Sequence, residues 1–343
     1  MLTPHWLWAN RSLAARLTRL ALIPPSLVFR GVMAARARAY QIRLLPHRAP
    51  PAPTVAVGNL TVGGSGKTPI AAWIAAHYAE RGMRPGIVLR GYGGDEGEVH
   101  RGLVKQAIVV EDADRLAGVR SAVDRGAEVL VLDDAFQRLD VGRDLNIAVV
   151  SAESDKAVRW TLPAGPWRES WRALRRADLI IVTRKRASLN AAERVARRAK
   201  RVAGREIIIA RLGITGFREL LSGTRFDASE IMGAHVVAAA GIADPATFGA
   251  QCSALGADVK LMPLNDHHRF SGRDMALLAR VTRRADYLIL TEKDAVKLRD
   301  RWPSTEPEPL VALLDIEWQR GYEHLERALD AVVDTVDDVL TYT

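Results

Sequence analysis

The chain has 343 residues, a formal net charge of +9 and one cysteine, Cys252. A single cysteine excludes an internal disulfide and a cysteine-built zinc site, and it fits a reducing compartment and a small buried apolar role. The length suggests one large or two medium domains, and the basic charge leaves nucleic acid, an anionic membrane and a phosphorylated substrate as candidate partners.

The first 49 residues carry eight arginines and no Asp or Glu, with Trp and aliphatic side chains between the arginines. Pro24 and Pro25 interrupt the longest apolar run, which falls short of the ~20 residues that span a bilayer, and the segment is a poor signal peptide. The pattern fits a basic amphipathic helix that either lies on an anionic membrane or packs on its own domain. The absence of acids favours the membrane, and the many aliphatic residues argue against a nucleic-acid arm. The prolines of 50–53 predict a stiff linker.

A glycine-rich segment follows, in which an apolar strand over 54–57 leads to Gly-Gly-Ser-Gly-Lys-Thr and a helix over 70–79. Strand, glycine loop and helix start predict a phosphate-binding loop, because glycines let backbone N–H groups converge on phosphate oxygens. Lys67 is expected to reach the β- and γ-phosphates and the Thr68 hydroxyl to bind Mg²⁺. Thr61 stands where the strict motif has glycine. The expected nucleotide-binding residues are Thr61, Val62, Gly63, Gly64, Ser65, Gly66, Lys67 and Thr68.

Acidic residues end two further predicted strands. The strand over 86–89 is followed by a glycine-rich stretch and then by Asp95 and Glu96. These two acids could supply a base or support a metal, or they could belong to a solvated turn. The strand over 127–134 ends in Asp133 and Asp134. A strand-end Asp is the expected partner of a phosphate loop, so both carboxylates are predicted to hold Mg²⁺.

Arg168 follows a proline-glycine turn and is a candidate for gripping a substrate phosphate, because a guanidinium binds phosphate bidentately. The basic helix over 189–202 is expected to be mostly a solvated face. The strand–helix pattern restarts at residue 235, and Asp266-His267-His268 follows a strand there. This cluster has too few ligands for a metal site and suits acid–base or hydrogen-bonding work, or else is a pair of surface histidines.

Alternating strands and helices predict an α/β protein. We expect a P-loop NTPase-like parallel-sheet domain over 50–215, a second, smaller α/β domain over 232–343 that closes a cleft, and an N-terminal amphipathic helix within 1–49. Such a cleft would place nucleotide on one wall and acceptor on the other.

Seven motifs in order resemble those of the tetraacyldisaccharide 4′-kinase (lipid A 4′-kinase) family. They are Gly58 to Pro69, Arg90-Gly91-Tyr92-Gly93, Asp133 to Gln137, Leu162 to Pro166, Ala240-Gly241-Ile242, Asp266-His267-His268 and Thr291-Glu292-Lys293-Asp294. The resemblance spans nearly the whole chain. It implies Mg²⁺-dependent transfer of the ATP γ-phosphate to the 4′-hydroxyl of an acylated disaccharide 1-phosphate, at the cytoplasmic face of the bacterial inner membrane, with no nucleic-acid partner.

The resemblance also implies roles for single residues. Asp95 would take the proton from the acceptor hydroxyl, together with His267 or His268. We expect Asp95 in the P-loop domain and the histidines in the other domain, so that they would meet on closure. Arg90, Gln137 and Arg168 are expected to contact the substrate.

Three features depart from the family pattern: Ala135 replaces a usual Gly, Arg138 replaces a usual His, and a stretch before Asp95 is missing. Two alternatives remain at this stage. One is a P-loop kinase or NTPase that acts on another lipid or phosphorylated substrate. The other is a membrane-bound or nucleic-acid-binding protein whose nucleotide site no longer does chemistry.

Overall fold

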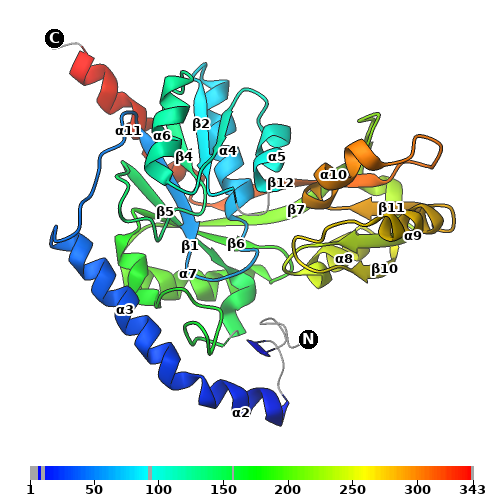
Figure 1. The fold of residues 1–343 in the computed structure, drawn as a ribbon, viewed down its shortest axis with the longest axis horizontal. Helices are drawn as coiled ribbons and strands as arrows, with labels where there is room; N and C mark the ends of the chain where they lie inside the picture. Colours follow the sequence, from blue (N-terminus) through cyan, green and yellow to red (C-terminus); the bar gives the residue numbers. More distant parts are fainter. Residues whose placement is uncertain (1–6, 9–11, 92–94, 157, 341–343) are drawn as a thin grey trace. The chain divides into compact units, whose positions relative to one another are not determined.

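The computed structural model describes residues 7–8, 12–91, 95–156 and 158–340, and the chain divides into two compact units (Figure 1). The first unit contains Met1–Arg90, Gln106–Ala210 and Trp318–Thr343, and the second contains Gly91–Lys105 and Arg211–Glu317. Strands β7 (Ile207–Glu219) and β12 (Leu310–Arg320) each begin in one unit and end in the other. Two segments therefore belong to another unit than expected: residues 91–105 belong to the second unit and residues 318–343 to the first. The expected ranges were contiguous in sequence, so they could not include a segment that joins the other unit.

The first unit is built on six parallel strands in the described part of the chain. Their order is β3 (Ile108–Glu111), β2 (Pro85–Leu89), β4 (Val129–Leu132), β1 (Thr54–Asn59), β5 (Leu145–Ser151) and β6 (Leu179–Arg184), and the start of β7 lies beside β6. Strand β1 lies between β4 and β5 and is buried along its whole length. Because parallel strands end at the same edge of a sheet, the segments that follow β1, β2, β4 and β6 gather there.

Four long helices cover this sheet: α4 (Lys67–Glu80), α6 (Arg115–Asp124), α7 (Leu189–Ala203) and α11 (Tyr322–Leu340). Val119 and Ala122 of α6 share a buried cluster with Ala56 of β1, and Val195 of α7 shares another with Ala148 of β5. Helix α4 is joined to α11 by the Tyr78 hydroxyl, which donates to the Leu329 carbonyl at 2.9 Å. The C-terminal helix is thus part of the first unit.

From residue 12 to residue 41 the described chain forms two helices, where the sequence suggested one. Helix α2 (Leu13–Ala21) and helix α3 (Ile23–Gln41) meet at a bend of 48°, and the prolines of the apolar run occupy the first turn of α3, where the missing N–H costs nothing. Among the described residues, no helix by itself is long and apolar enough to cross a membrane, although α2 and α3 together meet the length and composition criteria. Both helices group with the first unit, so the units do not divide at 50–53.

The second unit is a smaller α/β unit. Its parallel strands follow the order β10 (Asp258–Pro263), β9 (His235–Ala240), β11 (Tyr287–Leu290), β12, and β8 (Arg225–Asp227) pairs antiparallel with β7. Consecutive residues of β9 face opposite sides: Ala238 clusters with Phe248 of α8 (Pro245–Ala254), and Ala239 with Leu278 of α9 (Gly272–Thr282). Cys252 on α8 is fully buried, as its apolar role predicted.

Two short helices complete the second unit, α5 (Asp95–Leu103) and α10 (Glu292–Leu298), which contact each other. The sequence did not predict α5, because its glycines and acids resemble a turn. It also did not predict β7, β8, α9, α10 or α11. Strands β1, β2 and β4 and helices α4 and α7 lie where the sequence predicted them, with ends shifted by a few residues.

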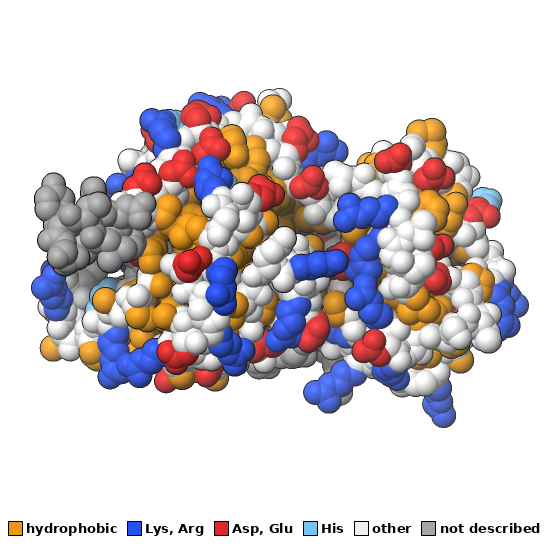
Figure 2. All heavy atoms as spheres, turned by 90° about the horizontal axis from the view of Figure 1, so that it is seen from above, with side chains coloured by type: hydrophobic (Ala, Val, Ile, Leu, Met, Phe, Trp, Pro, Cys, Tyr) orange, Lys and Arg blue, Asp and Glu red, His pale blue; other side chains and the backbone are white. Residues whose placement is uncertain are grey.

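The charge distribution separates the N-terminal helices from the rest of the chain. On the face shown in Figure 2, basic and acidic side chains are interspersed with apolar ones. Residues 1–49, by contrast, contain eight arginines and no acid. The N-terminal segment therefore has the one-sided charge that an anionic surface attracts.

Candidate functional site

The glycine loop lies between β1 and α4 and has the backbone geometry of an anion site. Gly63 and Gly66 adopt φ values of 115° and 88°, a region that other residues rarely enter. Lys67 is the first residue of α4, and Thr68 is the second and is buried. The unpaired N–H groups of the helix start therefore point out of the same loop that carries Lys67.

Neighbouring segments hold this loop. The Asn59 side-chain amide donates to the Ser65 hydroxyl at 2.7 Å. The N–H of Val62 donates to the Pro166 carbonyl at 2.8 Å, and the N–H of Arg168 donates to the Leu60 carbonyl at 2.7 Å. The proline-rich segment before Arg168 thus lies directly beside the loop.

The two acidic residues after β4 differ in their surroundings. Asp133 is buried, and its N–H donates to the Val88 carbonyl at 3.0 Å. Asp134 has a φ of 54°, a strained value for a residue with a side chain, and its carboxylate pairs with Arg168 at 2.8 Å. The same guanidinium donates to Gln137 at 3.4 Å. The structure therefore brings together Asp134, Gln137 and Arg168, which the sequence placed in two separate motifs.

Within the described residues, no group of three or more His, Cys, Asp or Glu side chains is arranged to hold a metal by itself. Mg²⁺ usually takes one or two carboxylates and completes its shell with water and substrate phosphate. Thr68, Asp133 and Asp134 supply oxygen donors of the kind that Mg²⁺ prefers, so the residues present fit this ion.

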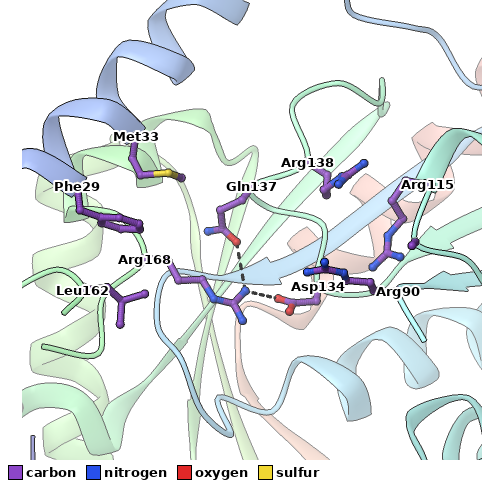
Figure 3. A pocket seen from close by; sticks show the side chains of 10 residues that line it. Phe29, Met33, Arg90, Arg115, Asp134, Gln137, Arg138, Leu162 and Arg168 are labelled. Carbon is purple, nitrogen blue, oxygen red and sulfur yellow. Dashed lines mark hydrogen bonds and ion pairs between the residues drawn. The ribbon is translucent and has the colours of Figure 1, made fainter. Parts of the chain in front are cut away.

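A pocket of about 370 Å³ opens beside Asp134 and has two unlike walls (Figure 3). One wall is apolar and comes from α3 and the proline-rich segment; the other carries guanidinium groups. The lining residues are Phe29, Met33, Leu162, Ala113, Asp134, Gln137, Arg90, Arg115, Arg138 and Arg168. All three expected substrate residues, Arg90, Gln137 and Arg168, line this pocket.

The sequence missed Arg115, which is buried at the start of α6. Its guanidinium donates to the carbonyls of Asp112 at 2.9 Å and Asp133 at 3.2 Å. Burial and the nearby Arg138 lower the pKa of Arg115 to about 10, so it stays charged at neutral pH. An arginine one residue beyond a helix N-cap carries no sequence signal, so only the fold could identify it, as with Phe29 and Met33.

A second group of charged residues lies within the second unit, around Asp95. Asp95 is 3% exposed, and its carboxylate forms an ion pair with Lys297 of α10 at 2.9 Å and contacts Nδ1 of His267 at 3.1 Å. His267 has a φ of 55°, another strained backbone value. Burial alone would raise the pKa of Asp95, but the hydrogen bond and charge of Lys297, with the charges of His267 and Lys293, outweigh burial and hold the pKa below its usual range.

The expected location of Asp95 is wrong. Its helix, α5, belongs to the second unit, and the contact with His267 forms inside that unit without any closure of domains. The physical reason is that the chain leaves the sheet after β2 and packs α5 against α10. The glycines at 93 and 94 lie outside the described residues.

The two histidines point to different partners. His267 contacts Asp95, whereas Nε2 of His268 lies 3.3 Å from Asp274 on α9. Only one of them therefore reaches the Asp95 carboxylate, as expected for a pair of adjacent residues.

The Thr-Glu-Lys-Asp motif contributes further contacts near Asp95. Lys293 pairs with Glu96 at 2.9 Å, and the buried Asp294 accepts from the Gly241 N–H at 2.9 Å. A Cβ at Gly241 would lie 2.6 Å from the Asp294 carboxylate, so only glycine fits. Burial raises the pKa of Asp294.

A parallel sheet with a glycine loop between its central strand and α4 defines a P-loop nucleotide-binding protein. Residues 18–334 match the family described as tetraacyldisaccharide-1-P 4′-kinase. The chain therefore belongs to this family, which confirms the resemblance drawn from its motifs. The family consists of ATP-dependent kinases of lipid A biosynthesis, and the expected fold class is confirmed as well.

Curated relatives and a solved structure agree with this assignment. The chain is 37% identical over 336 residues to the tetraacyldisaccharide 4′-kinase of Anaeromyxobacter sp. (strain K), covering 89% of this chain and 88% of the relative. It is 36% identical over 310 residues to that of Aromatoleum aromaticum, covering 84% and 87%. The crystal structure of LpxK from Aquifex aeolicus in complex with ATP superposes with a TM-score of 0.72 at 24% identity, covering 92% of this chain and 99% of that one.

Proposed function

We propose that this chain transfers the γ-phosphate of ATP to the 4′-hydroxyl of a tetraacylated glucosamine disaccharide 1-phosphate. The observation that carries the proposal is the pocket beside Asp134, with its apolar wall from α3 and its guanidinium wall. An acylated sugar phosphate has the same two chemistries, because its chains are apolar and its phosphate is anionic. A P-loop kinase without a lipid substrate has no need of the apolar wall.

The nucleotide would bind on the glycine loop. The N–H groups at the start of α4 and the Lys67 ammonium would hold the phosphates. The related kinase of Aquifex aeolicus was solved in complex with ATP. Thr68, Asp133 and Asp134 would hold Mg²⁺, which supplies neutralisation of the charge on the transferring phosphoryl group. Arg168, paired with Asp134, fixes the orientation of that carboxylate.

The acceptor would occupy the pocket. Arg90, Arg115 and Arg138 present guanidinium groups on one side, and a guanidinium binds phosphate and sugar oxygens in a fixed planar geometry. Phe29 and Met33 of α3 would contact an acyl chain on the other side. Arg138, which replaces a usual histidine, adds a guanidinium group to this wall.

Asp95 would take the proton of the acceptor hydroxyl. Phosphoryl transfer needs a group that orients the nucleophile and accepts its proton. His267 and Lys297 fix the Asp95 carboxylate in place and keep it ionised at neutral pH. His268, which faces Asp274, would support the loop and take no direct part.

The N-terminal helices would lie on the anionic cytoplasmic face of the inner membrane. Leu13 and Val28 are 73% and 68% exposed, and Leu17, Leu20 and Val32 are also largely exposed. Apolar side chains exposed among arginines are typical of helices in the headgroup region. The inward-facing side of α3 remains on the protein, since the buried Ser26 hydroxyl donates to the Thr161 carbonyl at 2.8 Å.

One assay tests the reaction. The full-length protein is incubated with γ-labelled ATP, Mg²⁺ and the disaccharide 1-phosphate in detergent, with Lys67→Ala as the matched inactive control. We expect a bisphosphorylated lipid from the wild type only. Release of labelled phosphate without labelled lipid would contradict the proposal and favour an NTPase. Label transferred only to a different acylated or phosphorylated acceptor would favour another kinase specificity.

Flotation with vesicles tests the membrane proposal. Leu17→Glu combined with Leu20→Glu should reduce binding to anionic vesicles at least about tenfold, because two apolar contacts are replaced by charges that the lipid repels. Leu221→Glu, at a 39% exposed leucine of the second unit, is the matched control and should bind normally. Equal binding by both variants would exclude α2 as the membrane contact.

A further inference from the structure

The end of strand β6 contacts two carbonyl groups of the glycine loop. The Thr183 hydroxyl, which is buried, donates to the Ser65 carbonyl at 2.7 Å. The Lys185 ammonium donates to the Gly64 carbonyl at 3.1 Å. Two consecutive loop carbonyls are therefore hydrogen-bonded to two side chains of the same strand end.

These contacts have a consequence for phosphate binding. A loop N–H can donate to a phosphate, whereas a loop carbonyl that faced it would repel it; the Ser65 N–H itself donates to the Gly63 carbonyl at 2.9 Å. Glycines on both sides of these peptide units allow the loop to rotate many ways, at a high entropic cost of fixing one conformation. Holding the Gly64 and Ser65 carbonyls against β6 keeps these two acceptors from turning towards the phosphates and limits the conformations of the loop before the nucleotide binds.

Glu153 holds the β6 end itself. Its carboxylate accepts from the backbone N–H groups of Lys185, Arg186 and Ala187 at 2.7, 2.9 and 3.1 Å, and from the Ser151 hydroxyl at 2.6 Å. Burial would raise the pKa of Glu153, but these hydrogen bonds outweigh it and keep the pKa low. Lys185 thus extends from a fixed backbone, although its side chain is partly exposed.

We propose that Thr183 and Lys185 are positioning residues for the nucleotide, which hold the phosphate loop in its binding conformation, and that Glu153 fixes the segment that carries them. Their effect is on nucleotide affinity. It is the same for ATP and ADP, because the held part of the loop faces phosphates that both nucleotides have. The acceptor and the Asp95 group are not involved.

The test uses the full-length protein without acceptor and measures Kd for ATP and ADP with Mg²⁺ by calorimetry. Lys185→Met should weaken both nucleotides about tenfold, the size of one hydrogen bond to a charged group. Thr183→Val should weaken both by about three- to tenfold. Arg186→Met, which removes the adjacent exposed cation, is the matched control and should leave both Kd values unchanged.

Two further measurements separate positioning from other roles. Lys185→Arg keeps a cationic donor and should restore affinity to within about threefold of the wild type. The kcat of Lys185→Met at saturating ATP should fall no more than about threefold, with an unchanged Tm. Unchanged affinity in Lys185→Met and Thr183→Val would overturn the proposal. A loss of affinity confined to ATP would also overturn the proposal, since it would indicate that Lys185 contacts the γ-phosphate. An equal loss of affinity in Arg186→Met would overturn it as well.

Discussion

The phosphate loop and the Asp95 group are assembled in opposite ways. The loop takes eight consecutive residues, from Thr61 to Thr68, between one strand and one helix, and hydrogen bonds from neighbouring segments support it. In the Asp95 group, the His267 imidazole and the Lys297 ammonium come from segments some 170 and 200 residues after Asp95 along the chain, and the three side chains lie on different elements. A site of the first kind depends mainly on local backbone conformation, and a site of the second kind depends on tertiary packing. Substitutions should therefore act differently in the two regions.

The largest expected effect comes from the loop. Lys67→Ala should reduce kcat/KM about 10³–10⁵-fold, the range known for a single cation on a transferring phosphoryl group. Labelled-lipid formation measures the loss, and circular dichroism should show an unchanged fold, since the residue begins α4 without being buried. Near-normal turnover in a folded variant would show that this loop does not bind the nucleotide.

Asp95→Asn should cost about 10²–10⁴-fold in kcat, the usual value of a general base, with the Kd for ATP unchanged. His267→Ala should cost less, and the double variant should lose far less than the product of the single effects, because the two side chains act as a unit. His268→Ala is the control, since this residue faces Asp274. Full activity in Asp95→Asn would show that Asp95 is not the base and would leave Glu96 and Asp133 as candidates.

Lys297→Met tests how the Asp95 group is tuned. Lys297 lowers the pKa of Asp95, so its removal should raise that pKa and move the acidic limb of the kcat/KM profile to higher pH. A carboxylate pKa that is lowered in the folded state contributes stability above the unfolded-state pKa, and this stability is lost as pH falls through the folded-state pKa. Because the folded-state pKa is raised in this variant, its acid-dependent loss of stability from Asp95 should be smaller than that of the wild type. Lys297→Arg should restore both profiles. Identical profiles in the wild type and Lys297→Met would show that Lys297 does not act on Asp95.

The smallest expected effect tests packing beneath the loop. A Cβ at Gly58 would lie 2.5 Å from the Phe136 nitrogen, so Gly58→Ala should lower the free energy of unfolding by about 1–3 kcal/mol. Gly31→Ala on α3 is the control: nothing lies within 4 Å, and alanine should raise stability by roughly 0.5–1 kcal/mol through helix propensity. Denaturant midpoints measure both. Equal midpoints would show that β1 does not need glycine there.

The sequence by itself determined the phosphate loop, the acidic ends of the strands, the α/β class and the family. These features depend on interactions between near neighbours: a glycine that permits positive φ, a strand that buries a continuous apolar run, a helix that begins at Lys67. Their residue types are enough to predict them. The roles of single residues in catalysis remain predictions.

Only the tertiary structure decided where Asp95 belongs and which residues surround it. Helix α5 looked like a turn because its glycines and acids have no helical pattern, and it forms by packing on α10. Arg115, Lys297, Lys185 and the apolar residues of α3 gave no sequence signal for the same reason. Lys and Arg together outnumber Asp and Glu in this chain, 49 to 40, and only the carbonyl or carboxylate that a distant segment brings near distinguishes one basic residue from the others.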